Sequence, residues 1–357
     1  MCYNRIALGN SPEKLTRNIT MKKKVFAALS ALLTATTLLS ACSTASQKLQ
    51  FSPNWTLRPL GNDGVITQAE VLTYEVSFED GTSLNEEYFS VTYCPNGKGS
   101  YVTTLSANPE VDGYTYTTAL TIEVEFELPD GTSELYTDSV TTTTVFKSTA
   151  NSLMPVRSEK TVQSHTPRNV SAMELKDAYT FYDYTVLTEY NADCTGATTT
   201  FTDRGKTLIA AEQYPAEKKN TFEIDREKYS YLDNEQILFA VRGLSSTVLS
   251  SQRKVIAYDA STNKVQEINL KPDTADSEKF AFSINGTPLA ADTVIEYIPL
   301  SLSINTKNAG SPVKAWYAKT TDPSNNVYRN VMLMMQTDIS YGIGSLRYDL
   351  KSAQFAD

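Results

Sequence analysis

The sequence predicts an all-β protein: one or two large curved antiparallel sheets, arranged as a half-barrel or β-roll, with one or two short helices. Two stretches, Leu72–Phe78 and Leu120–Phe126, alternate strictly between apolar and polar residues, which is typical of strands with one buried and one solvated face. Most of the later chain is rich in Thr, Val, Tyr and Phe, with 21 tyrosines in total. Clusters of Gly, Asn, Asp and Pro separate these runs, so the pattern indicates roughly a dozen or more strands.

A secretory signal begins at Met21. Three lysines at positions 22–24 form a basic start, an uncharged apolar run follows, and small residues come just before Cys42. This is the layout of a signal peptide over residues 21–41. The apolar run is shorter than the ~20 residues that a membrane-spanning helix needs. Residues 1–20 show no helical or strand period, so we interpret them as an upstream extension from a start codon assigned too early, or else as a long basic region of the signal.

The cysteine that ends this signal predicts a lipid anchor. Leu-Ser-Ala-Cys at 39–42 resembles the lipobox of bacterial lipoproteins, in which the thiol receives palmitate-type acyl chains and the chain is cut before the cysteine. Two acyl chains anchor a protein stably where one is marginal. We therefore predict lipid attachment at Cys42 and a mature chain at the extracytoplasmic side of the cell membrane. Residues 42–60 are predicted to be a short polar tether, and residues 61–352 the β domain.

The charge of the chain excludes nucleic acid as a partner. The whole chain has 32 Lys and Arg against 41 Asp and Glu, and the part from Cys42 onward has 26 against 40, a net charge of −14. Such a surface repels phosphate groups and gains little from anionic headgroups. We expect the acyl chains, rather than charge, to hold the protein on the membrane.

The first two predicted strands each precede an Asp-Gly pair, which is a strong hairpin-turn signal. We therefore predict two antiparallel hairpins, beginning at 72–83 and 120–133, which are either a duplicated unit or the result of convergent amphipathic patterns. Further strands are predicted at 139–148, 179–190, 198–202, 253–260, 264–271, 279–286, 293–304, 313–319, 327–338 and 344–350.

One segment has the pattern of a helix rather than a strand. Asp233 is suited to an N-cap and Gln236 follows three residues later, as in a capping box. Apolar residues then recur at helical spacing, and Gly243 is a natural stop. Residues 170–178 form a weaker second candidate.

Two cysteines remain for the folded domain, Cys94 and Cys194, and each lies beside a turn signal. Outside the cytosol such a pair can persist as a disulfide. Closing a loop of about 100 residues would then add roughly 4–5 kcal/mol of stability. The alternative is two free, partly buried thiols.

No catalytic motif, metal site or cofactor site is predicted. His165 is the only histidine, no Gly-x-Ser-x-Gly accompanies it, and we interpret it as a surface residue in a loop. A zinc site lacks the ligands it needs, and no phosphate-binding glycine loop is present. A pair of carboxylates for glycan hydrolysis stays open, since 40 acids follow position 41.

Several segments resemble a bacterial envelope family of unknown function, family 3108. They are LTYEVSF, LMPVRSEKT, YLDNEQILFAVRGL, KAWYA and GIGSLRYDL, in that order. The family pattern has an Arg after a proline-containing strand end, here Arg157, a helix ending in Arg-x-Leu, here Arg242, and a late Trp, here Trp316. The resemblance implies all-β half-barrels like those of lipoprotein carriers, and it implies no activity. The turn that usually precedes the late strands is missing, and the N-terminal half is longer.

Arg157 and Arg242 have two interpretations. They could face each other and clamp an anionic group, or each could pair with a neighbouring acid. Trp316 is likewise a candidate for ligand contact or for structure.

Three functions follow. The first is a non-catalytic lipoprotein that binds an apolar or amphipathic ligand, or a partner protein, in the concavity of its sheet. A concavity filled by the protein's own side chains would exclude the ligand. The second is an envelope glycan hydrolase with two acids ~5–9.5 Å apart. The third is a structural or assembly lipoprotein with a large exposed apolar patch.

Overall fold

The computed structural model confirms the predicted all-β class. It describes residues 48–51, 70–80, 90–149, 152–167, 174–205, 217–244, 248–259, 263–304, 312–319, 328–339 and 343–355. Within these ranges, eighteen strands are connected by hydrogen bonds into one sheet. No helix in the described ranges is both long and apolar enough to span a bilayer.

The sheet consists of two antiparallel arms that meet where β1 pairs with β18. One arm is the neighbouring series β1 (Glu70–Asp80), β3 (Gly99–Asn108), β4 (Gly113–Glu127), β5 (Ser133–Thr149), β6 (Ser152–Pro167), β7 (Tyr179–Tyr190), β8 (Gly196–Asp203) and β9 (Glu217–Glu223). The other arm is the series β18 (Gly344–Phe355), β17 (Met332–Asp338), β16 (Val313–Ala318), β15 (Val294–Ile304), β11 (Lys264–Pro272) and β10 (Arg253–Asp259).

Four further short strands pair with the strands of these two arms or with each other. β2 (Ser90–Tyr93) pairs with the end of β4, and β12 (Asp276–Lys279) pairs with β15. β13 (Ser283–Ile284) pairs with β14 (Thr287–Pro288) and runs parallel to β18. The single strand predicted at 279–286 is therefore wrong, because the chain there is split between β12 and β13.

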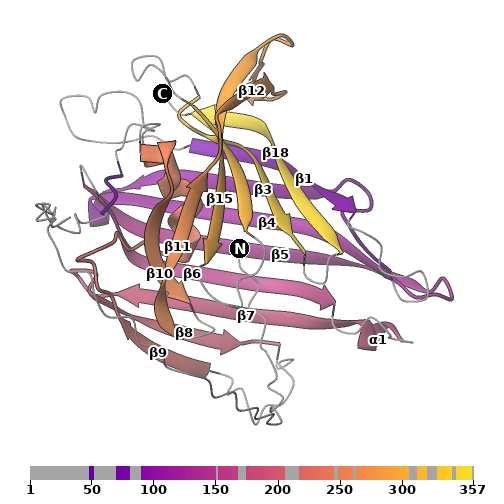
Figure 1. The fold of residues 1–357 in the computed structure, drawn as a ribbon. Coiled ribbons are helices and arrows are strands. Elements are labelled where there is room, and N and C mark those ends of the chain that lie inside the picture. The colour runs from indigo at the N-terminus through magenta and orange to yellow at the C-terminus, as the bar shows by residue number, and fades with distance from the viewer. Residues whose placement is uncertain are drawn as a thin grey trace, which may run out of the picture.

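The two arms face each other, as in an open, flattened barrel. Figure 1 shows β10, β11 and β15 crossing in front of the long strands of the first arm. Apolar side chains of both arms pack into one core cluster between them. The sheet stays open between β9 and β10, and we call this opening the seam.

Alternation along the strands follows the sequence pattern. In β4, Leu120, Ile122 and Val124 are buried, while the residues between them are more exposed. The hairpin predicted after β4 is confirmed, because β4 pairs with β5 and the turn contains Gly131 at φ +84°. Only glycine adopts such a φ without strain.

The first predicted hairpin is wrong. β1 is bonded to β18 and β3, whereas the strand that follows it, β2, is bonded to β4. Both edges of β1 are thus taken by β18 and β3, which are longer than the four residues of β2. The different partners of β1 and β4 also count against a duplicated unit.

Both predicted helices are present in shorter form. α1 (Leu175–Ala178) lies within the weaker candidate. The stronger candidate forms three continuous pieces, η3 (Asn234–Gln236), α2 (Ile237–Ala240) and η4 (Val241–Gly243), which we call the internal helix. Asp233 caps it by accepting a 2.9 Å hydrogen bond from the Glu235 N–H. Gln236 is buried and donates to the Leu153 carbonyl.

Candidate functional site

The space between the two arms is filled by the protein's own side chains. Phe239 of the internal helix is 1 % exposed, and its ring lies 4.9 Å from Tyr116 of β4 and 5.5 Å from Phe146 of β5. From the other arm, the Tyr317 hydroxyl donates to the Leu238 carbonyl at 2.9 Å. The internal helix therefore contacts both arms at once. Where these described side chains meet, an apolar ligand of the kind that the sequence suggested would have to displace them.

Arg242 is held by a buried ion pair with Glu70 of β1. Both side chains are at most 6 % exposed, and the guanidinium donates to the two carboxylate oxygens at 2.6 and 2.9 Å. It also donates to the Arg329 carbonyl at 3.0 Å. Burial alone would lower the pKa of Arg242, but the charge and hydrogen bonds of Glu70 raise it. The ion-pair interpretation is therefore confirmed for Arg242, and its role is to join the internal helix to β1.

The alternative in which Arg157 and Arg242 form a clamp is not realised. Arg157 is exposed on β6 and pairs with Glu159 at 2.9 Å, so it cannot approach the buried Arg242. Trp316 of β16 is half-buried and packs against the core. Its cross-strand partners are Pro299 and Met334. The structure thus separates the three residues that the family resemblance singled out.

Cys94 and Cys194 are two free, buried thiols. Each lies at a turn with positive φ, which agrees with the predicted turns. They belong to different hydrophobic clusters, so the disulfide alternative is not formed. Burial raises the pKa of each thiol to about 11.

We expect neither thiol to react with a thiol reagent in the folded protein at about pH 8, because the thiolate is the reactive form and burial disfavours it. Peptide mass spectrometry after labelling would measure this. In denaturant without reductant, both cysteines should become labelled. Failure to label them in denaturant would indicate a disulfide.

His165 lies in β6 and is largely buried, so its interpretation as a surface loop residue is wrong. Its side chain is 11 % exposed, and its Nδ1 lies 2.7 Å from Oδ1 of Asp138 on β5. The backbone N–H of His165 also donates to both oxygens of that carboxylate at 2.9 Å. The ring stacks on Tyr136 at 4.1 Å and contacts Phe181 at 4.6 Å.

This pair has the geometry of an Asp–His dyad but lacks a nucleophile. Its described contacts include no serine, threonine or cysteine side chain, and the two tyrosines whose rings contact it, Tyr136 and Tyr179, are hydrogen-bonded to each other through their hydroxyls. Burial raises the pKa of Asp138, and its hydrogen bonds with His165 partly offset this. The arrangement therefore stabilises the strand ends, and it does not assemble a Ser-His-Asp triad.

A second buried carboxyl, Asp233, connects the internal helix to the first arm. It accepts hydrogen bonds from the Ser158 hydroxyl at 2.7 Å and the Tyr190 hydroxyl at 2.5 Å. Burial raises the pKa of Asp233, against the effect of these bonds. Burial also acts to raise the pKa of Glu235, but the nearby Lys160 ammonium, 2.9 Å away, lowers it overall.

The seam is closed by side chains rather than by strand pairing. Phe222 of β9 stacks on Tyr258 of β10 with ring centroids 4.0 Å apart. The backbone of Tyr231 adds an isolated parallel β-bridge to Ile256 of β10. Two shallow grooves flank β9: one is bounded by Tyr190 and Thr198, and the other by the residues Lys228, Tyr229, Ile256, Lys264, Val265 and Glu267.

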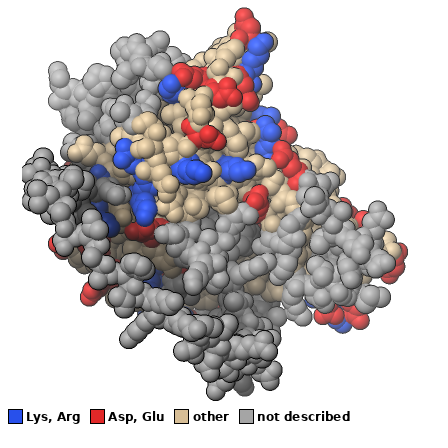
Figure 2. All heavy atoms as spheres, viewed as in Figure 1, with Lys and Arg blue, Asp and Glu red and all other residues tan. Residues whose placement is uncertain are grey.

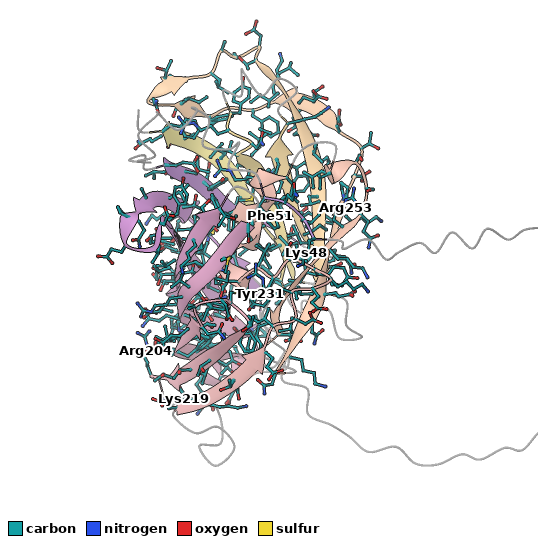
Figure 3. The ribbon with its side chains drawn as sticks, turned by 90° about the vertical axis from the view of Figure 1, so that its left-hand side faces the viewer. Lys48, Phe51, Arg204, Lys219, Tyr231 and Arg253 are labelled. Atoms are coloured by element: carbon teal, nitrogen blue, oxygen red, sulfur yellow. The ribbon has the colours of Figure 1, made fainter. Side chains whose placement is uncertain are left out.

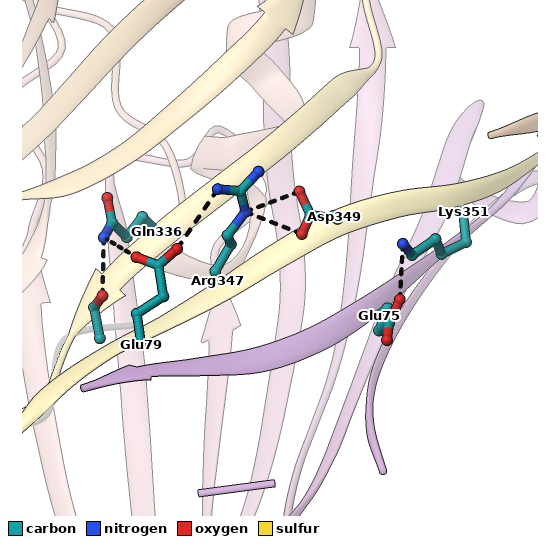
Figure 4. A network of polar contacts seen from close by, with 7 residues as sticks. Glu75, Glu79, Gln336, Arg347, Asp349 and Lys351 are labelled. Carbon is teal, nitrogen blue, oxygen red and sulfur yellow. Dashed lines mark hydrogen bonds and ion pairs between the residues drawn. The ribbon is translucent and has the colours of Figure 1, made fainter. Parts of the chain in front are cut away.

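No observation on the described carboxylates favours glycan hydrolysis, although Glu223 and Asp225 line both grooves. Asp138 and Asp233, whose pKa values are raised, line neither groove. On the outer face of β1 and β18 the acids are neutralised by bases, with Arg347 between Glu79 and Asp349 (Figure 4). The described residues also contain no group of three or more His, Cys, Asp or Glu side chains that could hold a metal.

Comparisons with known proteins give a fold outline only. No family model matches the chain, and no curated protein matches it. Among solved structures, it is similar to the crystal structure of a β-barrel-like protein of the domain of unknown function DUF1849 from Brucella abortus. That likeness has 10 % sequence identity and a TM-score of 0.47, and it covers 82 % of this chain and 100 % of the other. At these values it carries no information about function.

Proposed function

We propose that this protein is an extracytoplasmic lipoprotein, held on the cell membrane through Cys42, whose β domain binds a partner protein and catalyses no reaction. The observation that carries the proposal is the basic, apolar and small-residue layout of 21–41 that ends directly at Cys42. These residues lie outside the described part of the chain. Membership of family 3108, with its lipoprotein-carrier-like half-barrels, belongs to the same proposal.

A protein partner is favoured over an apolar ligand because Phe239 and its neighbours occupy the concavity. A broad apolar contact surface is not favoured either. The large hydrophobic side chains that are exposed in the described part are Leu135 and Val294, which lie on different strands. The partner would therefore be bound through a mixed polar and apolar surface, which is typical of non-obligate interfaces.

The test is mass spectrometry of the native protein together with fractionation of cells that express Cys42→Ser. We expect the native N-terminal peptide to begin at an acylated Cys42. The variant should keep its leader and lack the acyl chains. Cys2→Ser is the matched control and should leave processing unchanged. A native chain in the cytosol with an unmodified Cys42 and an intact leader would contradict the proposal.

A further inference from the structure

The chain enters the fold at the seam. Leu49 and Phe51 are 8 % and 2 % exposed and belong to the main core cluster, so this part of the predicted 42–60 tether belongs to the domain. The Leu49 carbonyl accepts a 2.9 Å hydrogen bond from the hydroxyl of Ser230. The Ser230 carbonyl in turn accepts from the Ile256 N–H of β10. Figure 3 shows Lys48 and Phe51 near Tyr231 and Arg253.

This entry point limits how far the domain can stand from an anchor at Cys42. Cys42 precedes Lys48 by six residues. A fully extended chain spans at most ~3.6 Å per residue, so this segment reaches no more than about 22 Å. If the proposed lipid anchor is correct, Lys48 lies within that distance of the acylated Cys42. The seam, where residues 49–51 pack, is then held close to the membrane.

Three lysines lie on or beside the strands that border the seam: one follows β9, one is in β10 and one begins β11. Lys228 and Lys264 are exposed and line one groove, and the Lys228 ammonium lies 4.9 Å from the centroid of the Tyr229 ring. Lys254 lies two residues before Ile256 and pairs with Glu267 at 2.6 Å. We call Lys228, Lys254 and Lys264 the seam lysines. Figure 2 shows basic side chains on the layer where β10 and β11 lie in Figure 1.

The charge of this region differs from that of the rest of the chain. Residues 217–271, which include both sides of the seam, have nine Lys and Arg against eight Asp and Glu, and one of the nine, Arg242, is neutralised by Glu70 outside this range. The charge there is therefore balanced rather than basic, since Glu223, Asp225 and Glu267 line the same groove as Lys228 and Lys264. The chain from Cys42 onward has a net charge of −14. An anionic headgroup layer repels the rest of the domain more strongly than it repels the seam. Lysine beside tyrosine is also a pairing that suits the interface between headgroups and water.

We propose that the seam, with its three seam lysines, is the face that the anchored protein lays against the lipid headgroups of its membrane. This inference rests on the proposed lipid anchor and adds an orientation to it. The end of the domain that carries α1 then points away from the bilayer, because Figure 1 places α1 on the opposite side from β9 and β10. That distal end is the part that remains accessible to a protein partner.

Lysine labelling of the native acylated protein tests this orientation. The protein would be compared in detergent and in vesicles of phosphatidylcholine and phosphatidylglycerol, with a water-soluble amine reagent and peptide mass spectrometry. We expect labelling of Lys228 and Lys264 to fall about threefold or more in vesicles, because headgroups cover them. Lys176 of α1, whose side chain is 73 % exposed, is the control and should label equally in both.

The same samples separate this inference from the proposed function. If the N-terminal peptide shows a bare Cys42, the lipid anchor itself is wrong. If Cys42 is acylated and the seam lysines label equally in vesicles and detergent, only the orientation is overturned. In Lys228→Glu/Lys264→Glu we expect Lys254 to lose protection, and in Lys176→Glu to keep it. Unchanged protection of Lys254 in the double variant would show that the charges of Lys228 and Lys264 do not hold the seam against the headgroups.

Discussion

Glu70→Ala is expected to lower the free energy of unfolding by about 3–5 kcal/mol, because it leaves the buried Arg242 charge without its partner. The two side chains are at most 6 % exposed and share two hydrogen bonds of 2.6 and 2.9 Å. The Arg329 carbonyl is the other acceptor seen on this guanidinium among the described residues, and it cannot balance a full charge. Urea unfolding followed by tyrosine and tryptophan fluorescence would measure the loss.

Two further variants test whether the buried charge is the cause. Glu70→Leu/Arg242→Met removes both charges, and we expect it to recover most of the lost stability, since apolar replacements of buried pairs are often nearly neutral. Arg157→Ala is the matched control, because it breaks an exposed ion pair with Glu159 and should cost less than about 1 kcal/mol. Equal losses in Glu70→Ala and Arg157→Ala would contradict the prediction.

The strands that could be predicted from the sequence are those rich in β-branched and aromatic residues. β7 coincides with the predicted 179–190 run, and β10, β11, β15 and β18 begin within one residue of their predictions. Their composition rather than an alternation marked them, because β7 and β10 do not alternate between buried and exposed residues. The short internal helix was predictable for a similar reason, since the Asp233 cap is a local interaction.

Elements without a clear period were missed. β6 interrupts its alternation with a register shift opposite Val145 and Phe146, and it contains Pro155 and the polar run that ends at His165. β9 contains mainly charged and polar residues that suit an edge strand. Neither strand has the regular alternation that marks a half-buried strand, so their positions depend on neighbours that are already in the sheet.

The polar contacts of the interior could not be predicted from the sequence, because they join positions that are far apart in the chain. Glu70 and Arg242 are 172 residues apart, and Asp138 and His165 are on neighbouring strands whose register is set by the whole arm. A lone histidine carries no signal that an aspartate will face it. The pairing of β1 with β18, which come from opposite ends of the domain, could not be predicted for the same reason.

Phe239→Ala is expected to cost about 3–5 kcal/mol, the usual loss for a fully buried phenylalanine, because the surrounding sheet cannot collapse onto the space. Its ring packs against Tyr116 and Phe146. Phe201→Ala, at a half-buried ring on β8, is the control and should cost less. Both losses would be measured by urea unfolding.

This substitution also tests whether the concavity is filled. The cavity left by Phe239→Ala would be lined by the rings of Tyr116 and Phe146, with the Arg242 guanidinium carbon 5.7 Å from the centroid of the removed ring. Mainly apolar cavities of this kind bind benzene or xenon. We therefore expect benzene to raise the melting temperature of the variant but not that of the unmodified protein. Stabilisation of the unmodified protein, or a loss in Phe239→Ala no larger than in Phe201→Ala, would mean that the concavity has free space. An apolar ligand between the two arms would then be restored as an alternative to a protein partner at the distal end.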